Sequence, residues 1–407
     1  MPNGVSLSGT DRMKTVTHIL LMSAMLLLSA CAQSPKQIEK VFYPPPPETP
    51  RIQFLTSITL ESDLGKKSQF KAYLLGEEQG GKSLARPYAF AHESGKIYVA
   101  DKTIKKIIIL DLDARAFDYI RDLKGGALQD PYSVFITPDG YKYVADANRG
   151  QIVVYNERNE FHRAYGAEGQ FRPTSVVLRE NRIYICDIAA SEIVILDKDS
   201  GGVIKKIGGI GKEEGSFYRP THLAIDATGN LYVTDAFNFR VQMFDREDKF
   251  VKVIGYQGSH PGSFVRPKGL DVDRDGHLYV ADAGFEIIQI FDVNSAEPLL
   301  PFGKYGPAPG STYLPSGVHI DYDNVAYFNK YADPDFKVEY LIYIGNTLGD
   351  HKLNVYGFGE WTGPSLKGYA KPESVQTDKQ QETVPSLDGV PVPQGTGATD
   401  KPGVDAK

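Results

Sequence analysis

The sequence predicts an all-β protein, a six-bladed β-propeller built from four-stranded antiparallel blades. A segment that opens with proline recurs six times at intervals of 42 to 48 residues. Each interval holds four short runs rich in Val, Ile, Tyr and Phe, separated by Gly, Asp and Asn. Four such strands in a repeat of about 40–50 residues match the size of a propeller blade. The opening prolines are Pro87, Pro131, Pro173, Pro220, Pro267 and Pro315.

A second marker, an Asp after the second strand-like run, supports the same register. It is found at Asp101, Asp146, Asp187, Asp235 and Asp282, and we expect Asn329 in the sixth place. A further strand-like run, residues 51–58, precedes the first repeat and belongs to none of the six. We expect it to pair as an outer strand with residues 353–358, because closure of the ring by both ends of the chain removes exposed strand edges.

The composition excludes several classes of protein. The 407 residues are 41% hydrophobic and 24% charged, as in a folded globular protein. A formal charge of −6 without basic blocks argues against nucleic acid as a partner. Two cysteines, Cys31 and Cys186, leave no disulfide framework or cysteine-rich zinc site, and the chain has no C-x-x-C-H motif for a c-type haem. We expect no cofactor and read Cys186 as a buried thiol.

The N-terminal residues indicate export. Residues 1–30 have the layout of a secretory signal peptide, with basic residues before an apolar run over residues 19–28. The ending Leu28-Ser29-Ala30-Cys31 resembles the lipobox of bacterial lipoproteins. That resemblance implies cleavage before Cys31 and acylation of this residue with fatty acids such as palmitate. Because Ala32 follows, it also implies an anchor in the outer membrane. An ordinary signal peptide with a chance cysteine is the alternative.

Two segments flank the predicted propeller, which spans residues 51–360. Residues 31–50 contain the lipidated Cys31 and a linker that ends in four prolines, a composition typical of an extended, semi-rigid spacer. A proline-rich ligand for a partner domain is the alternative. Residues 361–407 are rich in Pro, Gly, Thr, Asp, Lys and Gln, and we predict a disordered tail.

The repeats resemble the NHL-repeat propeller. The resemblance covers about residues 84–345 and is strongest in repeats four and five, where Leu278-Tyr279-Val280-Ala281-Asp282 precedes a strand that ends in Phe291-Asp292. Repeats one to three depart from it, and repeat six is the most degenerate. The full layout is similar to propeller lipoproteins of bacteria rich in multihaem cytochromes. It implies a protein-binding scaffold in the cell envelope, with a multihaem cytochrome or a porin as a partner.

Propeller geometry places the residues before each opening proline and those after each recurrent Asp on one rim. Four arginines that precede opening prolines, Arg86, Arg172, Arg219 and Arg266, either form part of a ring that binds an acidic partner or anion, or pair with the recurrent Asp residues as clamps between blades. The regular recurrence of Asp favours the clamp. Aromatic residues on this rim serve as interface hot spots or pack between blades. The candidates for this rim are Arg86, Arg172, Arg219, Arg240, Arg266, Tyr218 and Phe237, together with Tyr88, Tyr132 and Phe239.

Three histidines are candidates for a site in the channel. His222 lies two residues after Pro220, where the other repeats have Ala, Ser or Gly. His260 precedes the fifth repeat on the same rim, and His319 lies deeper, on the first strand of the sixth. Three His ligands with an open position suit catalytic zinc, and the alternative function is therefore a metal-dependent lyase or hydrolase at the channel mouth. The default interpretation is that these histidines are hydrogen-bonded or solvated and bind no metal.

Other catalytic signals are weak. The alternating Asp271, Asp273 and Asp275 superficially resemble a calcium loop, but the Glu that such a loop needs is absent, so we interpret them as a turn. The chain has no Gly-x-Ser-x-Gly nucleophile elbow. The sequence therefore favours a lipid-anchored binding scaffold over an enzyme, and a third hypothesis is a small anionic ligand in the channel.

Overall fold

The computed structural model describes residues 40–65, 81–93, 95–121 and 125–364. The predicted signal peptide, the lipidation site Cys31, linker residues 31–39 and tail residues 365–407 lie outside this range. Among the described residues, no helix has the length and apolar character needed to cross a membrane.

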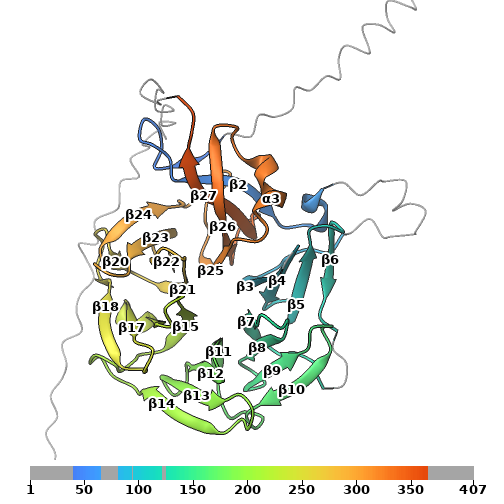
Figure 1. Cartoon of the computed structure of the whole chain (residues 1–407), viewed down its shortest axis with the longest axis vertical. Helices are drawn as coiled ribbons and strands as arrows, with labels where there is room; N and C mark the ends of the chain where they lie inside the picture. Colours follow the sequence, from blue (N-terminus) through green and yellow to red (C-terminus); the bar gives the residue numbers. More distant parts are fainter. Residues whose placement is uncertain (1–39, 66–80, 94, 122–124, 365–407) are drawn as a thin grey trace, which may run out of the picture. The chain divides into compact units, whose positions relative to one another are not determined.

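The described chain forms a ring of six blades, each with four antiparallel strands, which confirms the predicted fold class (Figure 1). The first three blades are β3 (Pro87–Glu93), β4 (Lys96–Asp101), β5 (Lys106–Asp111), β6 (Ala116–Tyr119); β7 (Pro131–Ile136), β8 (Lys142–Asp146), β9 (Gln151–Tyr155), β10 (Phe161–Tyr165); β11 (Pro173–Arg179), β12 (Arg182–Asp187), β13 (Glu192–Asp197), β14 (Val203–Gly208). The next two blades are β15 (Pro220–Ile225), β16 (Leu231–Asp235), β17 (Arg240–Phe244), β18 (Phe250–Ile254); β21 (Pro267–Val272), β22 (His277–Asp282), β23 (Ile287–Asp292), β24 (Pro298–Phe302). The sixth blade combines β25 (Pro315–Asp321), β26 (Phe336–Asn346) and β27 (Leu353–Trp361) with β2 (Ile52–Ile58).

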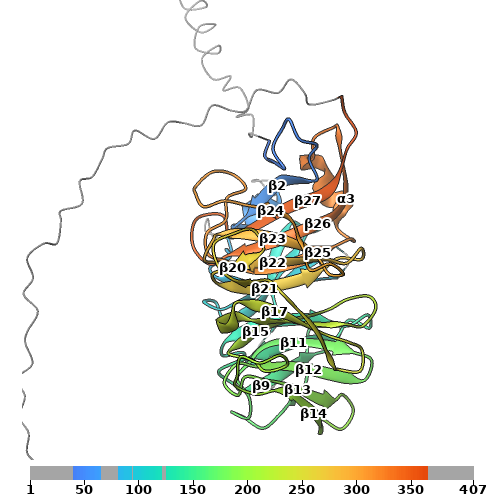
Figure 2. The ribbon, with the colours of Figure 1, turned by 90° about the vertical axis from the view of Figure 1, so that its left-hand side faces the viewer.

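The first strand of each blade lines the centre of the ring, so all six predicted prolines begin an inner strand (Figure 1). Because blades pack face to face, both faces of the middle strands are buried, and these strands read as continuous apolar runs. One core cluster joins Ile107 and Ile109 of the first blade to Val144 and Val153 of the second. In the side view of Figure 2, the fourth and fifth blades lie toward the viewer.

The ring is closed by a strand from the N-terminal side of the propeller, as predicted. Strand β2 pairs antiparallel with β27, with Ile52 opposite Phe358 and Ile58 opposite Leu353. A short strand, β1 (Phe42–Tyr43), adds a fifth strand outside β2. The expected spacer therefore differs from the structure over its described residues 40–50, because the Phe42 ring packs against Phe336 and Trp361.

The sixth blade contradicts one expectation. Pro315 pairs with Asn346, so Asn346 occupies the sixth Asp position, and the assignment of Asn329 was wrong. Asn329 instead begins η3 (Asn329–Tyr331), which follows helix α3 (Val325–Phe328) in an insertion between β25 and β26. The spacing between the opening proline and the recurrent Asp in the other blades, counted from Pro315, ends inside this insertion. The Asn346 side-chain oxygen accepts the Tyr313 backbone N–H at 3.0 Å, as the Asp residues do in other blades.

Candidate functional site

The two ends of the ring carry different loops. We call the end that holds the opening prolines and the recurrent Asp residues the proline rim, and the other end the opposite rim. The recurrent Asp carboxylates organise the proline rim. Asp282, which is fully buried, accepts backbone N–H groups of Val265 and Arg266 before the inner strand and of Gly284 and Phe285 after the second strand. Asp101 binds four backbone N–H groups in the same way.

The predicted Arg–Asp clamp is therefore wrong for four of the arginines. Among the described residues, no carboxylate forms an ion pair with Arg86, Arg172, Arg219 or Arg266, and all four are exposed. The physical reason is that backbone N–H groups, obligatory donors when buried, already occupy the Asp oxygens. The four guanidinium groups are consequently free to bind a partner.

Arg240 behaves differently and is not available on the rim. Its guanidinium pairs with Asp235 at 2.9 Å and donates to the backbone oxygens of Glu213 and Ser216. These contacts hold the loop before β15 against the blade. Arg240, predicted as a binding residue of the proline rim, is therefore a structural residue.

Near the channel axis the proline rim is strongly positive. Burial, followed by repulsion from Arg266 and Arg86, lowers the pKa of Lys268 to about 8. No carboxylate among the described residues pairs with Lys268. Tyr88 and Tyr132 meet edge to face beside it, with ring centroids 4.9 Å apart. This arrangement favours a partner that brings negative charge.

Tyr218 and Phe237, two of the aromatic candidates, are exposed side by side, with 40% and 55% of their surface accessible. Their rings meet edge to face at 5.6 Å, and the Arg219 guanidinium lies 5.8 Å from the Phe237 ring. Phe239, in contrast, packs against the core and is not a docking residue. An adjoining groove of about 420 Å³ includes Ile210, which is 76% exposed and which the sequence analysis missed. The groove is lined by Tyr132, Arg172, Ile188, Ala189, Ser191, Ile210, Tyr218 and Arg219.

Exposed apolar side chains are distributed unequally between the two rims. Every large exposed hydrophobic residue that lies outside the blade strands, in a described segment at either end of the ring, belongs to the proline rim. These residues are Leu60, Ile210, Tyr218, Phe237, Tyr256, Val265, Tyr305 and Leu348. The remaining ones lie on the outer strands, at Val203, Ile204, Val251 and Leu299. Such asymmetry makes the proline rim the more apolar of the two ends of the ring.

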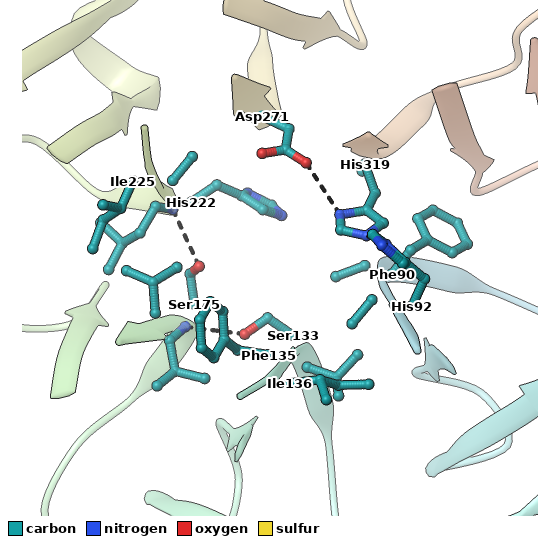
Figure 3. Close-up of a pocket in the computed structure, with 18 of the residues that line it drawn as sticks. Phe90, His92, Ser133, Phe135, Ile136, Ser175, His222, Ile225, Asp271 and His319 are labelled. Carbon is teal, nitrogen blue, oxygen red and sulfur yellow. Dashed lines mark hydrogen bonds and ion pairs between the residues drawn. The ribbon is translucent and has the colours of Figure 1, made fainter. Parts of the chain in front are cut away.

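The central channel contains a cavity of about 550 Å³ between the six inner strands (Figure 3). His222 of β15 lines it and is 5% exposed, with its ring stacked on Tyr88 at 5.6 Å. Neither ring nitrogen has a hydrogen-bond partner among the described residues. Burial, with a smaller contribution from Lys268, lowers the pKa of His222 to about 3, so its imidazole is neutral at physiological pH.

This buried imidazole predicts a pH-dependent stability. Because the pKa of His222 is lowered on folding, the unfolded chain binds a proton more readily below about pH 6.5. Stability is therefore retained above that pH and lost as the pH falls. Between pH 7 and 4.5 we expect the wild type to lose about 2 kcal/mol more unfolding free energy than His222→Phe. Urea unfolding at both pH values measures this difference, and equal losses in the two proteins would contradict the account.

On another wall of the cavity, His319 of β25 meets His92 of β3 (Figure 3). His319 Nε2 lies 2.8 Å from His92 Nδ1, and His319 Nδ1 lies 3.1 Å from the Asp271 carboxylate. His92 Nε2 lies 3.5 Å from both Asp321 and Asp323. Burial, and to a smaller extent His319, lowers the pKa of His92. His92 was not among the predicted site residues, although ring closure, which makes the first and sixth blades neighbours, was the signal that could have paired it with His319.

The three-histidine zinc set is not assembled. His222 and His319 line the cavity, but His260 is exposed in the turn between β19 (Tyr256–Gln257) and β20 (Ser263–Phe264) and does not line it. The described group with three metal-ligand atoms within 4.8 Å of one another consists of Asp273, Asp275 and His277.

That acidic group is a turn at the opposite rim. Asp273 accepts the backbone N–H of His277 at 2.8 Å and the Tyr340 hydroxyl at 2.6 Å. The carboxylate is thus occupied by the local structure, as the interpretation of these residues as a turn expects. Cys186 is buried, and burial raises the pKa of its thiol to about 12, so it packs as an apolar side chain.

A comparison with protein families names the same architecture. A family described as a 6-bladed β-propeller, DUF5128, matches residues 227–301. A Bacteroides thetaiotaomicron protein of unknown function is similar over 74% of this chain and 75% of its own, at 15% identity and a TM-score of 0.54. A virginiamycin B lyase from Staphylococcus aureus is similar over 68% of this chain and 86% of its own, at 14% identity and a TM-score of 0.45. Kuenenia stuttgartiensis hydrazine synthase is similar over 69% of this chain and 97% of its own, at 13% identity and a TM-score of 0.44. The protein is a six-bladed β-propeller.

Proposed function

We propose that this protein is a lipid-anchored scaffold of the bacterial outer membrane that binds another protein through its proline rim. The observation that carries the proposal is the asymmetry of the two rims. Exposed aromatic and aliphatic side chains of the loops gather on the proline rim, and four arginines there have no carboxylate partner among the described residues. Aromatic residues and Arg are the types that dominate binding at protein interfaces.

The charge of the proline rim indicates the chemistry of the partner. Unpaired guanidinium groups and Lys268 attract a surface that carries carboxylates, and the groove beside Ile210 accepts an apolar side chain. We propose a partner with an acidic surface around an exposed apolar centre. The resemblance to propeller lipoproteins supports a multihaem cytochrome or a porin in this role, and the lipobox-like ending at Cys31 supports the membrane anchor.

Photo-crosslinking in intact cells tests which face is used. A photoreactive amino acid at Phe237, on the proline rim, is expected to give one dominant crosslinked product, identified by mass spectrometry as an envelope protein. The same amino acid at Asp139, an exposed position on the opposite rim, is the control and is expected to give at least ten-fold less of this product. Equal yields from both positions, or no product at Phe237, would contradict the proposal.

A further inference from the structure

We propose that the central channel binds a small hydroxylated amine, such as an amino alcohol or an amino sugar, whose ammonium group is held by Asp271 and Asp323. This site is separate from the docking surface, because both carboxylates line the opposite-rim half of the cavity. Toward the proline rim, the His222 ring of β15 stacks on the Tyr88 ring of β3, from the blade on the other side of the channel, with centroids 5.6 Å apart. A ligand therefore enters from the opposite rim.

Counting protons on the two histidines reveals a missing donor. His319 and His92 stand between carboxylates: one hydrogen bond joins the two rings, and two further ring nitrogens lie within ion-pair distance of carboxylates, one near Asp271 and one near Asp321 and Asp323. Two neutral imidazoles carry only two N–H groups. With both rings neutral, one of these three contacts therefore lacks its proton, either between the rings or at a carboxylate. An ammonium bound here supplies both the missing donor and the missing positive charge.

The charges around the cavity favour a cation. No Lys or Arg lines it, whereas Glu93, Asp271 and Asp323 do. Glu93 is compensated by Lys142 at 3.4 Å. Asp271 and Asp323 have only histidines as ion-pair partners within the described chain.

Asp321 is not expected to bind the ammonium group. It is fully buried and accepts the Tyr343 hydroxyl and the Asn324 side-chain amide, each at 2.6 Å. Asp271 accepts the backbone N–H groups of Val272 and Ile320, each at 2.9 Å, but its carboxylate and that of Asp323 are partly exposed and keep lone pairs for an incoming ammonium.

The other walls of the cavity offer partners for hydroxyl groups. Neutral His222 has one donor and one acceptor nitrogen, both without partners, and burying them unpaired costs about 1–3 kcal/mol. Ser133 and Ser175 each accept a backbone N–H at 3.1 Å and have no acceptor for their own protons among the described residues. A hydroxyl both donates and accepts, so it matches the serine hydroxyls, and it matches a His222 nitrogen once the ring turns that nitrogen toward the cavity.

The dimensions fit a ligand of this class. A cavity of about 550 Å³ lies within the range of roughly 300–1,000 Å³ that is typical of small-molecule sites. In Figure 3, Asp271 and His319 face the cavity on one side, and His222 and Ser133 approach it from other sides. The ammonium and hydroxyl partners are thus presented to the same space.

Isothermal titration of the full chain with glucosamine and glucose tests the inference. The two sugars share a ring and most hydroxyls, but only glucosamine carries an ammonium. We expect glucosamine to bind at least ten-fold more tightly than glucose. Asp323→Asn, which changes a half-exposed turn residue, and Asp271→Asn are each expected to weaken glucosamine binding about ten-fold. Asp139→Asn removes the same charge from the opposite rim outside the cavity and is expected to have no effect.

Several outcomes would overturn the inference. Equal affinity for glucose and glucosamine would show that no ammonium is recognised. Absence of binding by both sugars would remove the site as proposed. Unchanged glucosamine affinity in Asp323→Asn would place any binding elsewhere. None of these outcomes bears on protein docking at the proline rim.

Discussion

Replacing Asp282 with Ala is expected to lower the free energy of unfolding by about 3–5 kcal/mol. The Asp282 carboxylate is fully buried and accepts four backbone N–H groups from two loops. Alanine removes every one of these acceptors at once, and buried donors without partners are costly. Urea unfolding, followed by tryptophan fluorescence and far-UV circular dichroism, measures the change.

Two further variants show whether the effect comes from these hydrogen bonds. Asp282→Asn is expected to lose less stability than Asp282→Ala, because an amide oxygen still accepts, as Asn346 accepts the Tyr313 backbone N–H in the sixth blade. Asp139→Ala, at an exposed turn position, is expected to change stability by no more than about 0.5 kcal/mol. A loss below about 1 kcal/mol in Asp282→Ala would contradict the role assigned to the recurrent Asp.

The repeat pattern was sufficient to predict the blades and their closure. Each proline begins an inner strand and each of the five Asp residues ends a second strand, because the local hydrogen bonds that these residues satisfy recur in every blade. Residues 52–58 could be assigned to the last blade because a ring of sheets leaves an edge that only a strand outside the repeats can fill. At these positions the local hydrogen bonds of each repeat and the strand pairing that closes the ring favour the same structure.

Where the prediction failed, the missing information was three-dimensional. Asn329 was misassigned because an insertion breaks the interval in the sixth blade. The Arg–Asp clamp was wrong because the sequence does not reveal that backbone N–H groups use the carboxylate oxygens first. His92 and His319 are 227 positions apart and come within hydrogen-bonding distance only through ring closure.

The second large effect is expected at the proline rim. Combining Arg172→Glu with Arg219→Glu places two negative charges in the groove beside Ile210, where an acidic partner is proposed to dock. Both side chains are exposed and form no ion pair among the described residues, so the change should leave the fold intact. Hot-spot arginines contribute about 2 kcal/mol or more to binding, and like-charge contacts add repulsion. We expect the affinity for the partner to fall at least 100-fold.

Quantitative affinity capture of the partner identified by crosslinking tests the docking account most directly. Wild type, the Arg172→Glu/Arg219→Glu variant and Arg158→Glu, an exposed reversal on the opposite rim, are compared at equal expression in the same cells. Docking through the proline rim predicts that the double variant loses the partner and that Arg158→Glu retains it. Retention of the partner by the double variant, or its loss from Arg158→Glu alone, would contradict docking through the proline rim.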